Sequence, residues 1–264
     1  MQGTWSVFCR EFGELRIIDV TQSSFRVEVP EKALLAMSQE FIDGAEQRGS
    51  VSADIREMLG RSVLGRALAA ASGSYLSGMS TYLIKLGPEN LWAGAHDIDH
   101  RIAASFPALT SRIRLQDMAQ MQADVLEEQI GAKRGRPLCM VNIAGGTAAD
   151  SWNALLWLRS RSPKCLDGRS IRIAVLDRDE GGPAFGARAV KTLQKPGAPL
   201  HGLNIEFQAI RYDWSDPQRL GVLLKGLEAE NAACVISSEG GLFEYGSDEE
   251  IVANLTALGA GTPT

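Results

Sequence analysis

The alternation of short apolar runs with helix-length segments after Pro137 constrains the fold of this chain more than any other feature. Four runs are short and apolar enough to be strands that are buried on both faces of a parallel sheet: Leu138–Ile143, Ile171–Leu176, Asn204–Ile210 and Ala232–Ile236. Helices are predicted between and after them, at Asp150–Ser160, Pro183–Leu193, Pro217–Glu230 and Ser247–Leu258. This order predicts an α/β fold with a doubly wound, mostly parallel sheet and right-handed crossovers.

The chain before Pro137 has a different, mainly helical pattern. Apolar residues recur with helical spacing in Glu31–Arg48 and again in a segment that Ser52 can cap and that extends to Leu64. A third helix is predicted at Ser111–Ile130, with Gly131 as its end.

A small hairpin is predicted ahead of these helices, with strands at Leu15–Val20 and Phe25–Val29 joined by a polar turn. The segment Gly73–Tyr82 is rich in small and hydroxylated residues and is predicted to be a loop. We therefore expect two regions, a hairpin with a helical lid or oligomerisation region over residues 1–136 and an α/β domain over residues 137–264.

Charge and cysteine pattern exclude several classes of function. The chain has 27 Lys and Arg against 32 Asp and Glu, a formal net charge of −5, so it offers no general attraction for nucleic acid or an anionic membrane. No apolar run approaches the roughly 18 residues of a membrane span, and no secretory signal is visible. The four cysteines form no Cys-x-x-Cys pair. We expect a cytoplasmic protein with a small-molecule ligand and no nucleic-acid or membrane partner.

Small and polar residues follow each predicted strand, and ligands of doubly wound sheets bind beyond these strand ends. After the first strand, small residues from Ala144 to Thr147 let a ligand approach the backbone, and the next helix offers free N–H groups. The second strand ends at Asp177, whose carboxylate can accept hydrogen bonds from a ribose diol. The third ends near Asp213 and Trp214, a polar acceptor beside an aromatic face suited to adenine.

Together these strand ends resemble those of the class I, Rossmann-like S-adenosylmethionine-dependent methyltransferases, over roughly Pro137 to Leu258. In that family the first strand ends in an acidic residue followed by x-Gly-x-Gly-x-Gly. The corresponding run here, Asn142-Ile143-Ala144-Gly145-Gly146-Thr147-Ala148, keeps the middle glycine. Asp177 falls where the family has its ribose-binding acid, and Asp213 and Trp214 fall where the family contacts adenine.

The resemblance implies that S-adenosylmethionine is the cofactor and that its methyl group passes in line to a small-molecule acceptor that the sequence does not name. It assigns cofactor contacts to Asn142, Ala144, Gly145, Gly146, Thr147, Asp177, Arg178, Asp213, Trp214 and Ser237. Ser238 and Glu239 follow the fourth strand and are the candidates for orienting the acceptor. If the helical region covers the site, its lid candidates are Arg112, Arg114, Tyr75, Tyr82 and Lys85.

Two other interpretations stay open. A relative that binds the cofactor without turnover would keep the same strand ends. An NAD(P)-binding Rossmann protein would need Gly-x-Gly-x-x-Gly and an acid about 20 residues further on. Here Asp177 follows Gly146 by 31 residues and the glycine spacing differs, so we expect this second interpretation to be the weaker one.

The predicted sheet has an open edge. The methyltransferase fold continues beyond its fourth strand with a fifth strand and an antiparallel hairpin, and little of this chain follows the last predicted helix. In the strand order 3-2-1-4 the fourth strand then has no neighbour on its outer side. Truncation, the N-terminal hairpin or a second copy in a homodimer would account for this edge, and missing substrate-binding elements would favour binding without turnover.

The best metal-site pattern in the chain is His96-Asp97-Ile98-Asp99-His100, since two histidines four residues apart share a helix face. No third ligand is identifiable in the sequence. We therefore interpret the segment as an ordinary acidic start of a helix and predict no metal.

Overall fold

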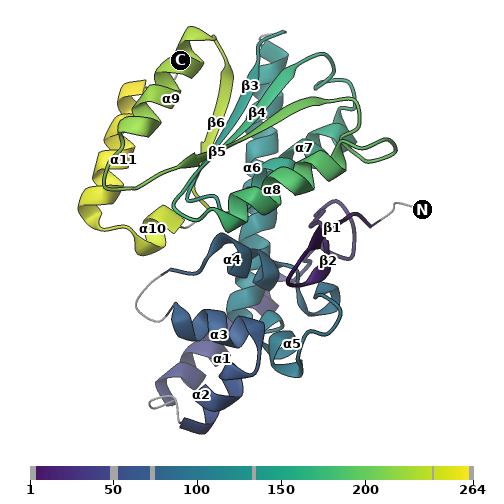
Figure 1. Cartoon of the computed structure of the whole chain (residues 1–264), viewed down its shortest axis with the longest axis vertical. Coiled ribbons are helices and arrows are strands. Elements are labelled where there is room, and N and C mark those ends of the chain that lie inside the picture. Colours follow the sequence, from purple (N-terminus) through teal and green to yellow (C-terminus); the bar gives the residue numbers. More distant parts are fainter. Residues whose placement is uncertain (1–3, 48–52, 72–74, 133–134, 240, 262–264) are drawn as a thin grey trace.

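The structure is a computed structural model that describes residues 4–47, 53–71, 75–132, 135–239 and 241–261 (Figure 1). Its centre is a parallel sheet of four strands: β3 (Leu138–Ile143), β4 (Ser170–Asp177), β5 (Asn204–Arg211) and β6 (Ala233–Ser237). Their spatial order is β5-β4-β3-β6, so the first strand of the sequence lies in the middle. The predicted α/β sheet of the Rossmann-like, doubly wound type is confirmed, and each predicted strand is found within about one residue of its expected ends.

Helices cover both faces of the sheet. On one face lie α6 (Phe106–Ala132), α7 (Ala149–Arg161) and α8 (Gly181–Leu193), and on the other lie α9 (Gln218–Ala229) and α11 (Asp248–Gly261), as Figure 1 shows. Successive strand side chains point to opposite faces, so Met140 and Ile173 join the first core and Val141 and Ala174 join the second. Burial on both faces is the reason that these strands are apolar throughout.

The N-terminal hairpin exists but not where it was predicted. It consists of β1 (Ser6–Cys9) and β2 (Gly13–Arg16), antiparallel to each other. The apolar residues that follow β2 form no strand, because backbone groups of Ile18 and Val20 bond to side chains, namely those of Trp152 and Asn153 in α7 and the Tyr82 hydroxyl. The Trp152 indole N–H donates to the carbonyl of Ile18 at 2.8 Å, and the backbone N–H of Val20 donates to Asn153 Oδ1 at 2.8 Å.

The first part of the helical region differs from the prediction in one respect, a break within the second predicted helix. Helix α1 (Glu31–Gln47) is as expected, but the second predicted helix is two helices, α2 (Ala53–Gly60) and α3 (Val63–Ala70). Ser62 separates them, because its hydroxyl caps α3 by accepting from the backbone N–H of Gly65 at 2.9 Å. The proposed cap, Ser52, lies outside the described residues.

The predicted loop over residues 73–82 is wrong in its second half. Residues 73 and 74 lie outside the described part, and α4 (Gly78–Lys85) begins behind Ser77, whose hydroxyl accepts from the N–H of Ser80. A short 3₁₀ helix (Pro88–Asn90) and α5 (Asp97–Ala103) connect α4 to α6. Helix α6 begins five residues earlier than predicted and continues past Gly131, and a five-residue helix, α10 (Gly241–Tyr245), follows β6.

Helix α6 joins the two regions, since it runs from the helical region along the sheet and packs against α7 and β6 (Figure 1). The side-chain amide of Gln129 donates to the carbonyl of Cys234 at 3.3 Å, at the edge strand β6.

The hairpin packs against α8, with Arg188 donating to the Cys9 sulfur, so it does not cover β6. Pairing of β6 with a second copy stays a prediction. No helix in the described residues is long and apolar enough to cross a bilayer.

Candidate functional site

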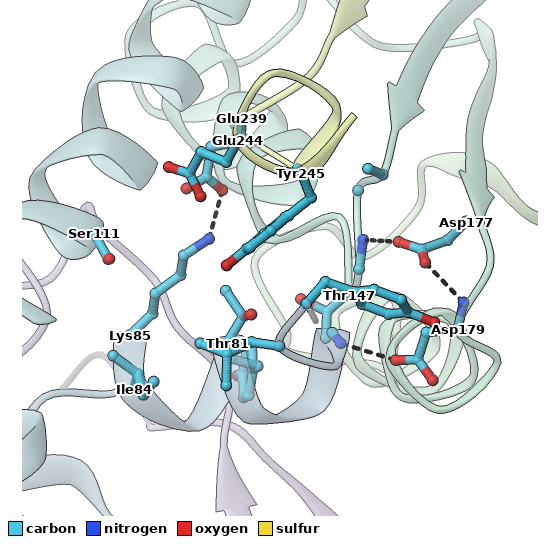
Figure 2. Close-up of a pocket in the computed structure, with 18 of the residues that line it drawn as sticks. Thr81, Ile84, Lys85, Ser111, Thr147, Asp177, Asp179, Glu239, Glu244 and Tyr245 are labelled. Atoms are coloured by element: carbon cyan, nitrogen blue, oxygen red, sulfur yellow. Dashed lines mark hydrogen bonds and ion pairs between the residues drawn. The ribbon is translucent and has the colours of Figure 1, made fainter. Parts of the chain in front are cut away.

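A cavity of about 310 Å³ lies at the carboxyl edge of the sheet, between the strand ends and helices α4 and α6. We divide its lining into two groups. The strand-end arm consists of Ala144, Gly145, Gly146, Thr147, Asp177, Arg178 and Trp214, and the α4 arm consists of Thr81, Lys85, Ser111, Arg114, Glu239 and Glu244. Figure 2 shows Lys85, Ser111, Glu239 and Glu244 on one side and Asp177 on the other, with the Tyr245 ring directed between them. The volume is at the lower end of the roughly 300–1,000 Å³ of small-molecule pockets.

The turn between β3 and α7 has an unusual backbone. Ala144, Gly146 and Ala148 all have positive φ, at 53°, 53° and 57°. A left-handed conformation costs an alanine on the order of 1–2 kcal/mol, so hydrogen bonds must hold this turn. Ala144 N–H donates to the carbonyl of Leu176 at 2.8 Å, and Gly146 N–H donates to Asp177 Oδ2 at 2.7 Å. These bonds fix the small-residue backbone to β4 along the cavity.

Asp177 is the centre of the strand-end arm. Its second oxygen accepts from the backbone N–H of Asp179 at 2.8 Å (Figure 2). Burial raises the pKa of Asp177, although the two N–H groups act in the opposite direction, and the net shift is upward. A carboxylate has about four acceptor sites, so each oxygen can take one further donor from the cavity. The group is therefore suited to a pair of neighbouring hydroxyls.

Asp179 holds α4 against this turn. Its carboxylate accepts from the backbone N–H groups of Gly78, at the start of α4, and of Gly181 and Gly182, at the start of α8, at 2.9 to 3.1 Å. Three glycine backbones meet there, and a Cβ on Gly78 would lie 2.7 Å from Gly146 Cα and 3.2 Å from Gly182 Cα. No sequence pattern indicates this role of Asp179, since its partner Gly78 is 101 residues away.

The α4 arm contains a buried ion pair. Lys85 Nζ donates to Glu239 Oε2 at 2.7 Å, and the two side chains are 9% and 13% exposed. Arg114 lies beside them, with Nε 3.5 Å from Glu239 Oε1 and with an ion pair to Glu244. These side chains come from α4, α6, α10 and the second residue after β6, so both regions of the chain build this arm.

A buried polar network lies behind the α4 arm, around Asp150 at the start of α7. Asp150 Oδ2 accepts from the Gln122 amide at 2.5 Å and from the Ser237 hydroxyl at 3.0 Å. The Asn142 side-chain amide has one orientation in which both its nitrogen and its oxygen have partners. In it the NH2 group donates to the Asp150 carboxylate and the oxygen accepts from the Ser151 hydroxyl. Burial first, and then the charge of Glu239, raise the pKa of Asp150 to about 6.

The structure separates the predicted site residues into two sets. Those that line the cavity are Ala144, Gly145, Gly146, Thr147, Asp177, Arg178, Trp214 and Glu239. The others, Asn142, Asp213, Ser237 and Ser238, are not part of its lining. Asn142 and Ser237 belong to the Asp150 network, and Asp213 forms a half-exposed ion pair with Arg178 at 2.7 Å. Their roles as ligand contacts stay predictions.

Most lid candidates also reach the cavity, namely Tyr75, Tyr82, Lys85 and Arg114. Arg112 instead lies beside Gly87, whose Cβ would meet its guanidinium within 3 Å. The Tyr82 hydroxyl donates to the carbonyl of Arg16 at 2.7 Å and accepts from the N–H of Ile18, and burial raises its pKa. Glu244 and Tyr245 also line the cavity but were not predicted, because α10 is too short to give a periodic signal.

His96 and His100, the two histidines of the metal-site pattern, lie at the start of and within α5. His96 is its N-cap, with Nδ1 accepting from the backbone N–H of Ile98, while Asp99 accepts from the His96 N–H. The His100 ring contacts the carbonyl of Pro88 at 2.9 Å. Within the described residues no group of three metal-ligating side chains comes together.

No protein-family model matches the chain, and the search of curated proteins gives no match. The functional interpretation therefore depends on the residues of the cavity.

Proposed function

We propose that the chain is an S-adenosylmethionine-dependent methyltransferase whose strand-end arm binds the cofactor. The observation that carries the proposal is Asp177, which is bonded to the small-residue turn and faces the same cavity as Trp214. A carboxylate at the end of the second strand, beside a turn of small residues, is the arrangement that a ribose diol requires.

The residues of the strand-end arm fit the cofactor. Asp177 has acceptor sites left for the two ribose hydroxyls, and the absence of side chains at Gly145 and Gly146 gives the ligand access to the backbone. Trp214 offers a ring face for adenine, and its buried indole N–H has no hydrogen-bond partner among the described residues. In this proposal Trp214, rather than Asp213, contacts the adenine.

The chain's own residues supply position rather than covalent chemistry. When bound, the cofactor provides a methyl group on a sulfonium, and in-line transfer depends mainly on how donor and acceptor are held. The ends of β3 and β4 hold one side of the cavity, and α4 and α6 enclose the other, where the acceptor would lie near Glu239.

Titration calorimetry with S-adenosylmethionine and its demethylated product tests the proposal. Asp177→Asn removes the charge that accepts the ribose hydroxyls, and we expect about 10- to 100-fold weaker binding, since such hydrogen bonds contribute about 1.5–3 kcal/mol each. Asp167→Asn is the matched control, because Asp167 is an exposed carboxylate paired with Arg159. Absence of heat with both ligands at millimolar concentration contradicts the proposal.

The same protein samples decide between the alternatives. NAD as a third titrant tests the dinucleotide interpretation. Transfer of labelled methyl from the bound cofactor to added small-molecule acceptors distinguishes an enzyme from a relative that binds without turnover. Binding of the cofactor with no transfer to any acceptor favours the binding-only relative.

A further inference from the structure

The α4 arm has hydrogen-bonding capacity that the protein itself does not use. Glu239 Oε1 is buried and has no hydrogen-bond partner among the described residues, while Oε2 accepts from Lys85. The nearest donor is Arg114 Nε, which forms an ion pair with this oxygen at 3.5 Å but makes no hydrogen bond to it, so Nε also has no hydrogen-bond partner among the described residues. A buried carboxylate oxygen without a donor is costly, so this position favours a ligand that supplies an N–H or O–H.

The charges around this oxygen favour a cationic ligand. Lys85 and Arg114 are the cations of the arm, and each is paired, with Glu239 and with Glu244. Asp150 lies behind them and is close enough for Glu239 and Lys85 to change its pKa. Above about pH 6, three carboxylates therefore face two cations, an excess of one negative charge.

The remaining lining also suits an ammonium group. An ammonium has three donors and no acceptor, and the hydroxyls of Thr81 and Ser111 line the same arm. The Tyr245 ring is directed into the cavity beside Lys85 and Glu239 (Figure 2), and an aromatic face attracts a cation. A carboxylate ligand would bring a fourth negative charge and would leave Glu239 Oε1 without a donor.

We infer that the α4 arm binds a primary ammonium group of a small-molecule substrate, with Glu239 Oε1 accepting one of its N–H bonds. The inference rests on the proposed function for the identity of the ligand in the neighbouring arm. Glu239 and Glu244 are then the residues that determine which substrates enter, and amines are selected over acids and alcohols of the same shape.

Three probes of similar size test this selection on the full chain without cofactor: butylammonium, butyrate and 1-butanol, measured by ligand-observed NMR at pH 7.5. We expect millimolar binding of butylammonium and at least fivefold weaker binding of the other two. Glu239→Gln should weaken butylammonium binding about tenfold, and Glu244→Gln about threefold. Glu230→Gln is the matched control, because Glu230 is as exposed as Glu244 (43% each) and pairs with Arg172 at the other edge of the sheet.

Each outcome decides the question. Binding of butyrate or butanol that equals or exceeds that of butylammonium overturns the inference. So does the absence of butylammonium binding to the unmodified protein. Butylammonium binding that is unchanged in the Glu239 and Glu244 variants also overturns it. If Glu239→Gln fails to fold, Glu244→Gln decides, since that side chain is partly exposed. Asp177→Asn should weaken cofactor binding and leave butylammonium binding unchanged, so failure of the proposed function and failure of this inference are distinguishable.

Discussion

The two ends of helix α4 are attached to the sheet by different interactions. At its start, Gly78 packs directly against the backbones of Gly146 and Gly182, and Asp179 accepts the N–H groups of the contact. At its end, Lys85 forms a buried ion pair with Glu239. The first attachment depends on the absence of side chains and the second on the presence of two opposite charges.

This difference has consequences for the cavity between them. A contact of backbones holds one distance and tolerates no added atom. A buried ion pair can exchange partners with a ligand, but it carries a large desolvation cost when one partner is lost. We therefore interpret the start of α4 as a rigid support of the strand-end arm and its end as the part that responds to a bound group.

The largest effect is expected at the charged end. Lys85→Met leaves the buried Glu239 carboxylate with Arg114 as its one cation, 3.5 Å away and without a hydrogen bond, and we expect the free energy of unfolding to fall by about 4 kcal/mol. Lys85→Met combined with Glu239→Leu removes both charges and should recover much of that loss. Urea denaturation measures both, with Arg61→Met as control, because the exposed Arg61–Glu57 pair should contribute less than about 1 kcal/mol. Equal losses in Lys85→Met and Arg61→Met would show that the pair is effectively solvated.

A pH dependence of intermediate size is expected from Asp150, behind the charged end. Its pKa of about 6 in the folded protein is above the ordinary 3.8, so the native state binds the proton more tightly than the unfolded state. The free energy of unfolding should therefore fall as pH rises from about 4 to 6, by about 3 kcal/mol from this residue. Asp150→Asn should remove this slope. Parallel stability profiles of the two proteins between pH 4 and 8 would contradict the assignment.

A smaller effect is expected at the glycine contact. Gly78→Ala places a methyl group 2.7 Å from Gly146 Cα, and because backbones cannot rotate away, we expect a loss of about 2 kcal/mol of unfolding free energy. Gly221→Ala, in helix α9 with nothing within 4 Å of the added atom, should stabilise the protein by up to about 1 kcal/mol. The same sign in both variants, measured by thermal unfolding, would falsify the close approach at α4.

The strands of the sheet were predicted well because burial on both faces affects the residue type at every position of a strand. A strand buried on both faces must be apolar at every position, and Leu138–Ile143 is recognisable from this property. Residues 17–20 also have the composition of a strand, but their backbone bonds to the side chains of Trp152, Asn153 and Tyr82. Composition reports burial, and it does not report whether the backbone partner is a strand or a helix.

Of the two groups that line the cavity, the strand-end arm is the one whose position the sequence predicted. Asp177 and Gly146 were identified from their positions at strand ends, and a hydrogen bond joins them. Helix α4 was missed because small and hydroxylated residues have weak helix propensity, and packing against the sheet outweighs that preference. Asn142 and Ser237, which were assigned to the ligand, hydrogen-bond to the buried Asp150, and their contacts with a ligand stay predictions.

The sequence by itself determined the order of strands and helices, the parallel sheet and the carboxyl edge at which its polar residues collect, because hydrophobic periodicity and turn chemistry act over a few residues. Only the tertiary structure decided that Gly78 meets Asp179 and that Lys85 meets Glu239, 101 and 154 residues apart. No local signal selects such partners, since any lysine could pair with any carboxylate. The choice follows from how α4 packs on the finished sheet, where burial makes one pairing far more favourable than the others.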